Sequence, residues 1–125
     1  MFNLPHTIGT LIRDSRITVD IFPMSPEVNW FLFKKKHIAI NKNIGFYQKR
    51  FAVCHELAHS ILEHKIEDKV HEREADQYAM RELIPEDELV ERITLYQRWV
   101  YELEKYFGVE RSIIEKRIKE VFKLW

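Results

Sequence analysis

The segment RFAVCHELAHSILEH, residues 50–64, sets two histidines and a glutamate in the order His-Glu-x-x-His within an apolar run. Burial of polar side chains is costly unless a partner satisfies them, and a metal ion is one such partner. On a helix, His55 and His59 lie on one face, so both imidazoles can bind one zinc ion. Glu56 flanks that point and has the geometry of a general base acting on water at the metal. The spacing therefore predicts a zinc hydrolase site.

A catalytic zinc site needs a third protein ligand and one open position. In one class of such sites the third ligand is a histidine six residues after the second. In this sequence Lys65 stands at that position, and His64 is rotated about 140° away from the face of His59 by helix geometry. The sequence therefore excludes this arrangement.

The segment HEREADQYA, residues 71–79, offers a carboxylate ligand instead. Glu72 and Asp76 lie four residues apart, on one face of a helix, whereas Glu74 points elsewhere. We predict that Glu72 is the third ligand. Asp76 is then placed to accept the free N–H of a zinc-bound histidine, most simply His55, which fixes the tautomer and the orientation of the ring.

A small sheet is expected to precede these helices. The alternation of apolar and polar residues predicts strands at 16–22, Trp30–Phe33 and Ile38–Ile40, and the last two resemble a hairpin with lysines at its turn. A short helix is expected at 3–14. These signals predict an antiparallel sheet of about three strands.

The rest of the chain has helical periodicity. One helix is expected from Tyr47 through the His-Glu-x-x-His motif, and a second, ligand-bearing helix at 69–84. Two C-terminal helices are expected at 86–107 and 111–123, with Gly108 ending the first of them. Strands followed by helices indicate an α+β fold, which we expect to form one domain over residues 1–125.

Composition sets the broad class. The chain is 46% hydrophobic and 32% charged, as in globular proteins, and its single cysteine cannot form an internal disulfide. No signal peptide and no membrane span is predicted, so a cytoplasmic location is expected. Residues 56–91 carry twelve acidic and four basic side chains, which argues against a nucleic-acid-binding face in that region.

The quoted motifs resemble those of the ImmA/IrrE family of zinc metallopeptidases. The likeness is best over 50–85, where RFAVCHELAHSILEH is followed by EREADQYAMRELIP, and the tail YFGVERSIIEKRI is also similar. The resemblance implies the same ligands and base as the spacing does. It also implies the cleavage of a helix-turn-helix transcriptional repressor encoded in a phage or another mobile element. Two departures, Ala58 in place of the common glycine and Tyr78 in place of phenylalanine, touch no predicted ligand.

Two other functions are compatible with the sequence. The helices around FGVE could imitate a DNA-binding helix-turn-helix, although Glu110, Glu115 and Glu120 are interleaved with the basic residues. The chain could also be an inactive module that binds zinc and a partner protein. Either His71 or Tyr78 could stabilise an oxyanion, and the sequence does not decide between them.

Overall fold

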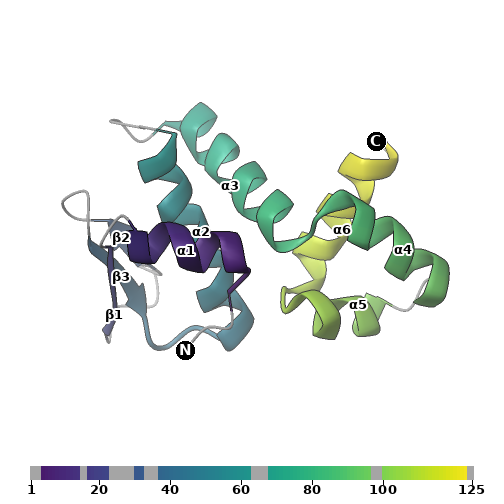
Figure 1. Ribbon diagram of the computed structural model, residues 1–125, viewed down its shortest axis with the longest axis horizontal. Helices are drawn as coiled ribbons and strands as arrows, with labels where there is room; N and C mark the ends of the chain where they lie inside the picture. Colours follow the sequence, from purple (N-terminus) through teal and green to yellow (C-terminus); the bar gives the residue numbers. More distant parts are fainter. Residues whose placement is uncertain are drawn as a thin grey trace.

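The computed structural model describes residues 4–14, 17–22, 30–32, 37–62, 68–96 and 100–123. The sheet, α1 and α2 lie at one end of the molecule, α4, α5 and α6 lie at the other, and α3 runs between them (Figure 1). The elements in chain order are α1 (His6–Asp14), β1 (Thr18–Phe22), β2 (Trp30–Leu32), β3 (His37–Asn41), α2 (Phe46–Ile61), α3 (Lys69–Leu83), α4 (Glu86–Tyr96), α5 (Val100–Phe107) and α6 (Arg111–Phe122).

The sheet has three strands in the order β1-β3-β2, but the prediction that it is antiparallel was wrong. β2 pairs antiparallel with β3, as a hairpin requires, whereas β1 pairs parallel with β3, with Val19 opposite Ile38. Alternation reports which face of a strand is buried and carries no information about which neighbour the strand chooses. The central position of β3 agrees with its composition, because Ile38, Ala39 and Ile40 are all fully buried.

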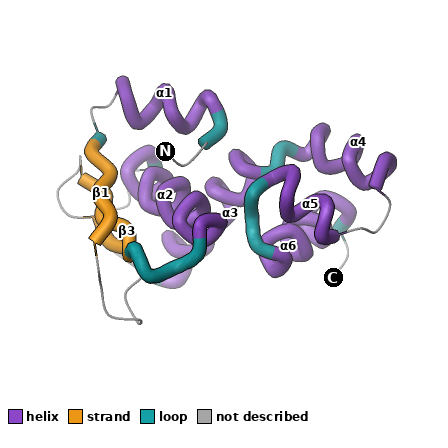
Figure 2. The backbone as a smooth tube through the Cα atoms, turned by 90° about the horizontal axis from the view of Figure 1, so that it is seen from below, coloured by secondary structure: helices purple, strands orange, loops and turns teal. Residues whose placement is uncertain are grey.

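Helix α2 lies between the sheet and α3 (Figure 2). It begins where the Gln48 side chain accepts a hydrogen bond from the backbone N–H of Gly45, at 2.9 Å. Every residue from Ala52 to His59 is buried, so this stretch is covered on all sides and not along a single stripe. Polar groups on such a helix must find partners within the protein.

Helix α3 packs along α2. Its N-cap is Asp68, whose carboxylate accepts a hydrogen bond from the backbone N–H of His71 at 2.8 Å. Ala75 and Ala79 are fully buried, as is Ala58 on α2. Small side chains on both helices allow the two backbones to approach closely.

The single helix expected at 86–107 is two helices, so three helices follow α3 where two were predicted. The chain reverses between α4 and α5 (Figure 1). The guanidinium carbon of Arg92 lies 4.1 Å from the centroid of the Tyr106 ring. Fourteen residues of one straight helix would separate these two positions by about 21 Å. The apolar stripe continues across both helices, so periodicity alone could not reveal the reversal.

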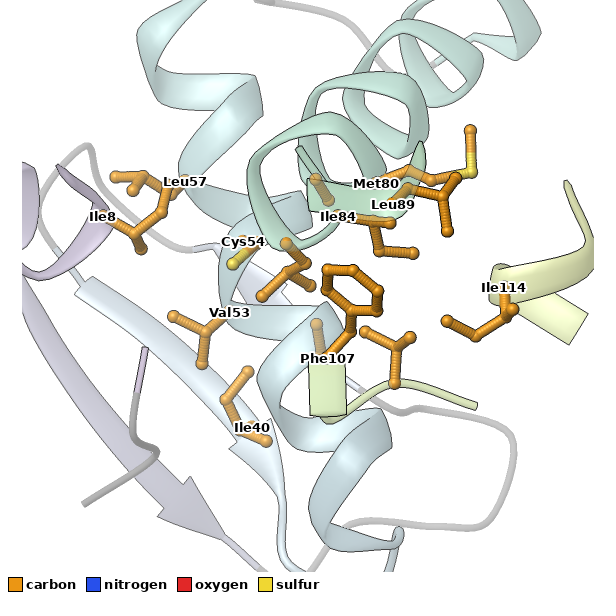
Figure 3. Close-up of a cluster of buried hydrophobic side chains, with 14 of the residues drawn as sticks. Ile8, Ile40, Val53, Cys54, Leu57, Met80, Ile84, Leu89, Phe107 and Ile114 are labelled. Carbon is orange, nitrogen blue, oxygen red and sulfur yellow. The ribbon is translucent and has the colours of Figure 1, made fainter. Parts of the chain in front are cut away.

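One hydrophobic cluster joins the two ends of the molecule (Figure 3). It extends from Ile8 and Ile40 through Leu57 to Leu89 and Ile114, all of them fully buried or nearly so. α5 ends at Gly108, which takes a positive φ of 66° as predicted for a helix-ending glycine. Within the described ranges, no helix has both the length and the apolar content needed to cross a membrane.

Candidate metal centre

His55 and His59 lie on neighbouring turns of the buried part of α2. Their rings are nearly perpendicular, with centroids 4.8 Å apart, and their Nε2 atoms are separated by 3.2 Å. Two nitrogens that each lie about 2.0–2.1 Å from a tetrahedral zinc ion are roughly 3.3 Å apart. The separation of the two imidazole nitrogens therefore suits two ligands of one ion.

Glu72 on the first turns of α3 faces both histidines. Its Oε2 lies 3.0 Å from Nε2 of His55 and its Oε1 lies 2.9 Å from Nε2 of His59. The ligand atoms of these three residues all lie within 4.8 Å of one another. Glu74 is exposed and lines a separate hollow with Tyr78 and Arg81. The structure thus brings together the three predicted ligands and leaves Glu74 outside the cluster.

Asp76 contacts the other nitrogen of His55. Its Oδ1 lies 2.7 Å from Nδ1 of that ring, so a proton on Nδ1 is donated to the carboxylate. In the neutral imidazole, Nε2 then presents a lone pair to the carboxylate of Glu72. With that tautomer, Nε2 of His55 and the carboxylate of Glu72 are both acceptors, and a cation between them would make the contact attractive.

An orphaned atom supports the same conclusion. Glu72 Oε1 is buried and, within the part of the chain that the structure describes, no donor meets it with hydrogen-bond geometry. The nearby Nε2 of His59 is at a suitable distance but not at a suitable angle. A metal ion needs lone pairs and no intervening proton, so these three residues fit a divalent cation and their donor types fit zinc.

Glu56 is 1% exposed and directly follows His55. It is not one of the three clustered ligands, in keeping with its offset of one residue along the helix. A buried carboxylate next to a ligand is placed to act on protons at the site. A role for Glu56 as the base in metal-assisted hydrolysis stays a prediction.

The site is reached from the side of α3. The side chains of His55 and His59 are almost fully covered, whereas those of Glu72 and Asp76 are 38% and 53% exposed. An open hollow of about 480 Å³ lies over this surface, lined by Asp68, Lys69, Glu72, Arg73 and Asp76.

Three other residues near the motif have different environments. Burial raises the pKa of the Cys54 thiol to about 12, so this side chain is a protonated apolar group and not a thiolate. His71 Nδ1 lies 3.4 Å from the N-cap carboxylate of Asp68. Tyr78 packs against the hydrophobic core, and burial, followed by the nearby charge of Glu82, raises the pKa of its hydroxyl. Oxyanion stabilisation by His71 or Tyr78 stays a prediction.

Sequence reasoning assigned no role to Arg50, although this residue is only 7% exposed. Its Nη1 donates to the carbonyl oxygens of Phe107 and Gly108, each at 2.7 Å. The available signal was a charged residue four positions before Cys54, on the buried side of an apolar helix. That signal indicates burial, but it cannot name a backbone partner 57 residues away.

Comparison with known proteins decides the family. The model of a peptidase family described as the IrrE N-terminal-like domain matches residues 12–119, which include every residue of the cluster. The chain belongs to this family. The matched residues include the His-Glu-x-x-His helix α2 and the helix α3 that follows it. A comparison with curated proteins found no match.

A similar fold occurs in part of a longer chain of known structure. A Mycobacterium tuberculosis transcriptional regulator matches with a TM-score of 0.74 and 16% sequence identity. The match covers 90% of this chain but only 40% of that protein. At this identity the likeness concerns the fold alone, and the chain spans well under half the length of the regulator.

Proposed function

We propose that this chain is a zinc-dependent endopeptidase. The observation that carries the proposal is the convergence of His55, His59 and Glu72 on one point beside the buried Glu56, in a chain of a peptidase family. A zinc ion, when bound, supplies Lewis-acid activation of the scissile carbonyl and of the attacking water. The rest of the reaction depends on groups of the protein.

Each nearby residue has a distinct task in this proposal. Glu56 accepts a proton from the attacking water and passes it to the nitrogen of the leaving amine. Asp76 holds His55 through Nδ1, which fixes the ring and leaves Nε2 as a ligand. The apolar surroundings of α2 limit water around Glu56, so its charge acts in a medium of low polarity.

We further propose that the substrate is a helix-turn-helix transcriptional repressor encoded in a phage or another mobile element. The motif resemblance supports this substrate class. An open hollow beside Glu72 and Asp76 suits an extended protein segment better than a small enclosed ligand.

We do not propose DNA binding by the C-terminal helices. α6 packs against α5 and α3, and its Arg117 is buried with its Nε donating to the carbonyl of Ile84 at 2.8 Å. The other basic residues of α6, Arg111, Lys116 and Lys119, are exposed, but the acidic Glu115 is exposed among them, so we do not propose base recognition by this helix. The inactive-module alternative shares the metal site with the enzyme, so only an activity assay separates the two.

Glu56→Gln tests the proposal because it keeps the size of the side chain and removes the proton acceptor. Cleavage of a co-expressed helix-turn-helix repressor from the same genetic element should fall by roughly 10² to 10⁴, while zinc content stays that of the wild type. Glu74→Gln, which changes an exposed glutamate outside the cluster, is the matched control and should cleave normally. Equal cleavage by Glu56→Gln and wild type would remove Glu56 from the mechanism. A repressor that is bound but not cut by the wild type would favour the inactive module.

A further inference from the structure

A buried arginine ties the ligand-bearing helix to the C-terminal helices. Arg50 lies on α2, five residues before His55, and its guanidinium reaches the turn between α5 and α6. Both bonded carbonyls, of Phe107 and Gly108, are at the C-terminal end of α5, where helix carbonyls lack partners within the helix. A cation at this end is also favoured by the helix dipole.

The guanidinium of Arg50 packs closely against Gly108. Gly108 takes a φ of 66°, which side chains disfavour, and a Cβ at this position would lie 3.0 Å from Cζ of Arg50 and closer still to Nη1. The guanidinium thus occupies the space that the missing side chain leaves. Arg50 and Gly108 form a matched pair, in which each residue restricts what the other position can hold.

A charge in this position is not explained by stability alone. Burial lowers the pKa of Arg50 and makes its cation costly to hold there, and a well-packed apolar side chain is often as stabilising as a buried charged group. What an arginine adds is direction, because its planar fork fixes two carbonyls relative to the backbone that bears it. The guanidinium therefore fixes how α2 sits against the α5–α6 turn.

We propose that Arg50 is a positioning residue for the metal centre, holding the His55–His59 turn of α2 in place by binding the α5–α6 turn. Arg50 lies about 7.5 Å along the helix axis from His55, so a small tilt or slide of α2 at Arg50 shifts both imidazoles. The ligands need a separation matched to one ion within a few tenths of an ångström. The inference rests on the proposed metal site and adds the C-terminal helices to its support.

Arg117 offers a matched control. It is likewise a buried arginine that donates to a backbone carbonyl, that of Ile84, and it also pairs with Glu120. Ile84 is the C-cap of α3 and lies twelve residues after Glu72, or about 18 Å along the helix axis. Arg117→Met removes the same kind of contact far from every ligand, whereas Arg50→Met removes it near two of them.

The test is a Co²⁺ titration of the full chain, followed by visible absorption, with unfolding midpoints measured on the same samples. Arg50→Met should weaken Co²⁺ binding by roughly 10–100-fold, the range for residues that orient ligands, and change the shape of the spectrum. Arg50→Lys should show a smaller loss, since an ammonium lacks the fork. Arg117→Met should lower the unfolding midpoint and leave Co²⁺ affinity within about threefold of the wild type, because additivity holds for distant sites.

Gly108→Ala provides a second route to the same conclusion. It should weaken Co²⁺ binding in the wild-type background by displacing the guanidinium, and have a smaller effect when Arg50 is already methionine. Equal Co²⁺ affinity in Arg50→Met and the wild type, or equal losses in Arg50→Met and Arg117→Met, would overturn the positioning role alone. A wild-type chain that gives no Co²⁺ spectrum would overturn both the proposed function and this inference.

Discussion

Helices α2 and α3, which form the candidate metal centre, and the C-terminal helices α5 and α6 both bury charged or polar side chains, but the two pairs of helices satisfy them differently. In the first region, His55 is met by the side chains of Asp76 and Glu72, and the groups converge on one point. In the second, Arg117 is met by the backbone carbonyl of Ile84, next to the side chain of Glu120. The converging side chains form a candidate metal-binding site. The bond from Arg117 to the end of α3 instead stabilises the packing of the helices.

This difference separates what each region should do when it is changed. Loss of a converging group removes affinity for an ion and leaves most of the packing intact. Loss of a group bound to a helix end leaves a buried carbonyl unsatisfied and weakens the fold itself. Arg50 is informative because it binds backbone carbonyls at a helix end, as Arg117 does. It nevertheless lies on α2, close to the converging side chains of the candidate metal centre.

The largest expected effect tests whether Glu72 belongs to the convergent group. Zinc at 100 times its dissociation constant should stabilise the wild type by about 2.7 kcal/mol, by mass action. Glu72→Ala should lose this zinc-dependent gain, while Glu74→Ala should retain it. The free energy of unfolding with and without zinc is the measurement. If zinc raised the free energy of unfolding of Glu72→Ala as much as that of the wild type, Glu72 would not be a zinc ligand.

Asp76→Ala should have an intermediate effect. Without the carboxylate at 2.7 Å, the His55 ring loses the acceptor that fixes its tautomer, but all three ligands remain. Zinc affinity, measured by competition with a chromophoric chelator, should fall by roughly 10–100-fold, or about 1.4–2.7 kcal/mol. Unchanged affinity would show that Asp76 is only a surface charge and that His55 is oriented by packing.

The smallest effect concerns pH and the C-terminal region. Burial by itself would raise the pKa of Glu120, but hydrogen bonds and charges from Arg81 and Arg117 outweigh it, so the pKa lies below its ordinary value of 4.5. A lowered pKa in the folded state means that this stabilisation is present above about pH 4.5 and is lost as pH falls through the folded-state pKa.

Glu120→Gln should therefore be less stable than the wild type at neutral pH, by less than about 1 kcal/mol, and the two should converge in acid. Denaturant titrations of zinc-free protein between about pH 7 and pH 3 measure the difference. Glu115→Gln, which disrupts an exposed pair with Arg111, is the control and should show little pH dependence of this kind. A difference that is constant across this range would mean that the charge of Glu120 has no role in holding α6.

The residues of the candidate metal centre and the extents of several helices could be predicted from the sequence. His55, His59, Glu72 and Asp76 are related by spacings of four residues on two helices, and helix geometry alone brings such pairs to one face. That is why the cluster found in the structure consists of the residues chosen from the sequence. The extents of α2, α3 and α6 also follow closely from periodicity and end signals.

The features that could not be predicted depend on partners remote in the chain. The parallel pairing of β1 with β3 is a choice between neighbours that the alternation of either strand does not encode. The reversal between α4 and α5 interrupts an apolar stripe that continues on both sides of it. The contact from Arg50 to Phe107 and Gly108 involves backbone carbonyls, which every residue possesses and no sequence pattern marks.

The most direct measurement of the central claim is anomalous diffraction at the zinc absorption edge, from crystals of protein loaded with one equivalent of zinc. The account predicts a single strong peak about 2.0–2.2 Å from Nε2 of His55, Nε2 of His59 and one carboxylate oxygen of Glu72. It also predicts that Nδ1 of His55 stays bound to Asp76. A peak located elsewhere, or one with Glu74 or His71 in place of Glu72, would contradict the account.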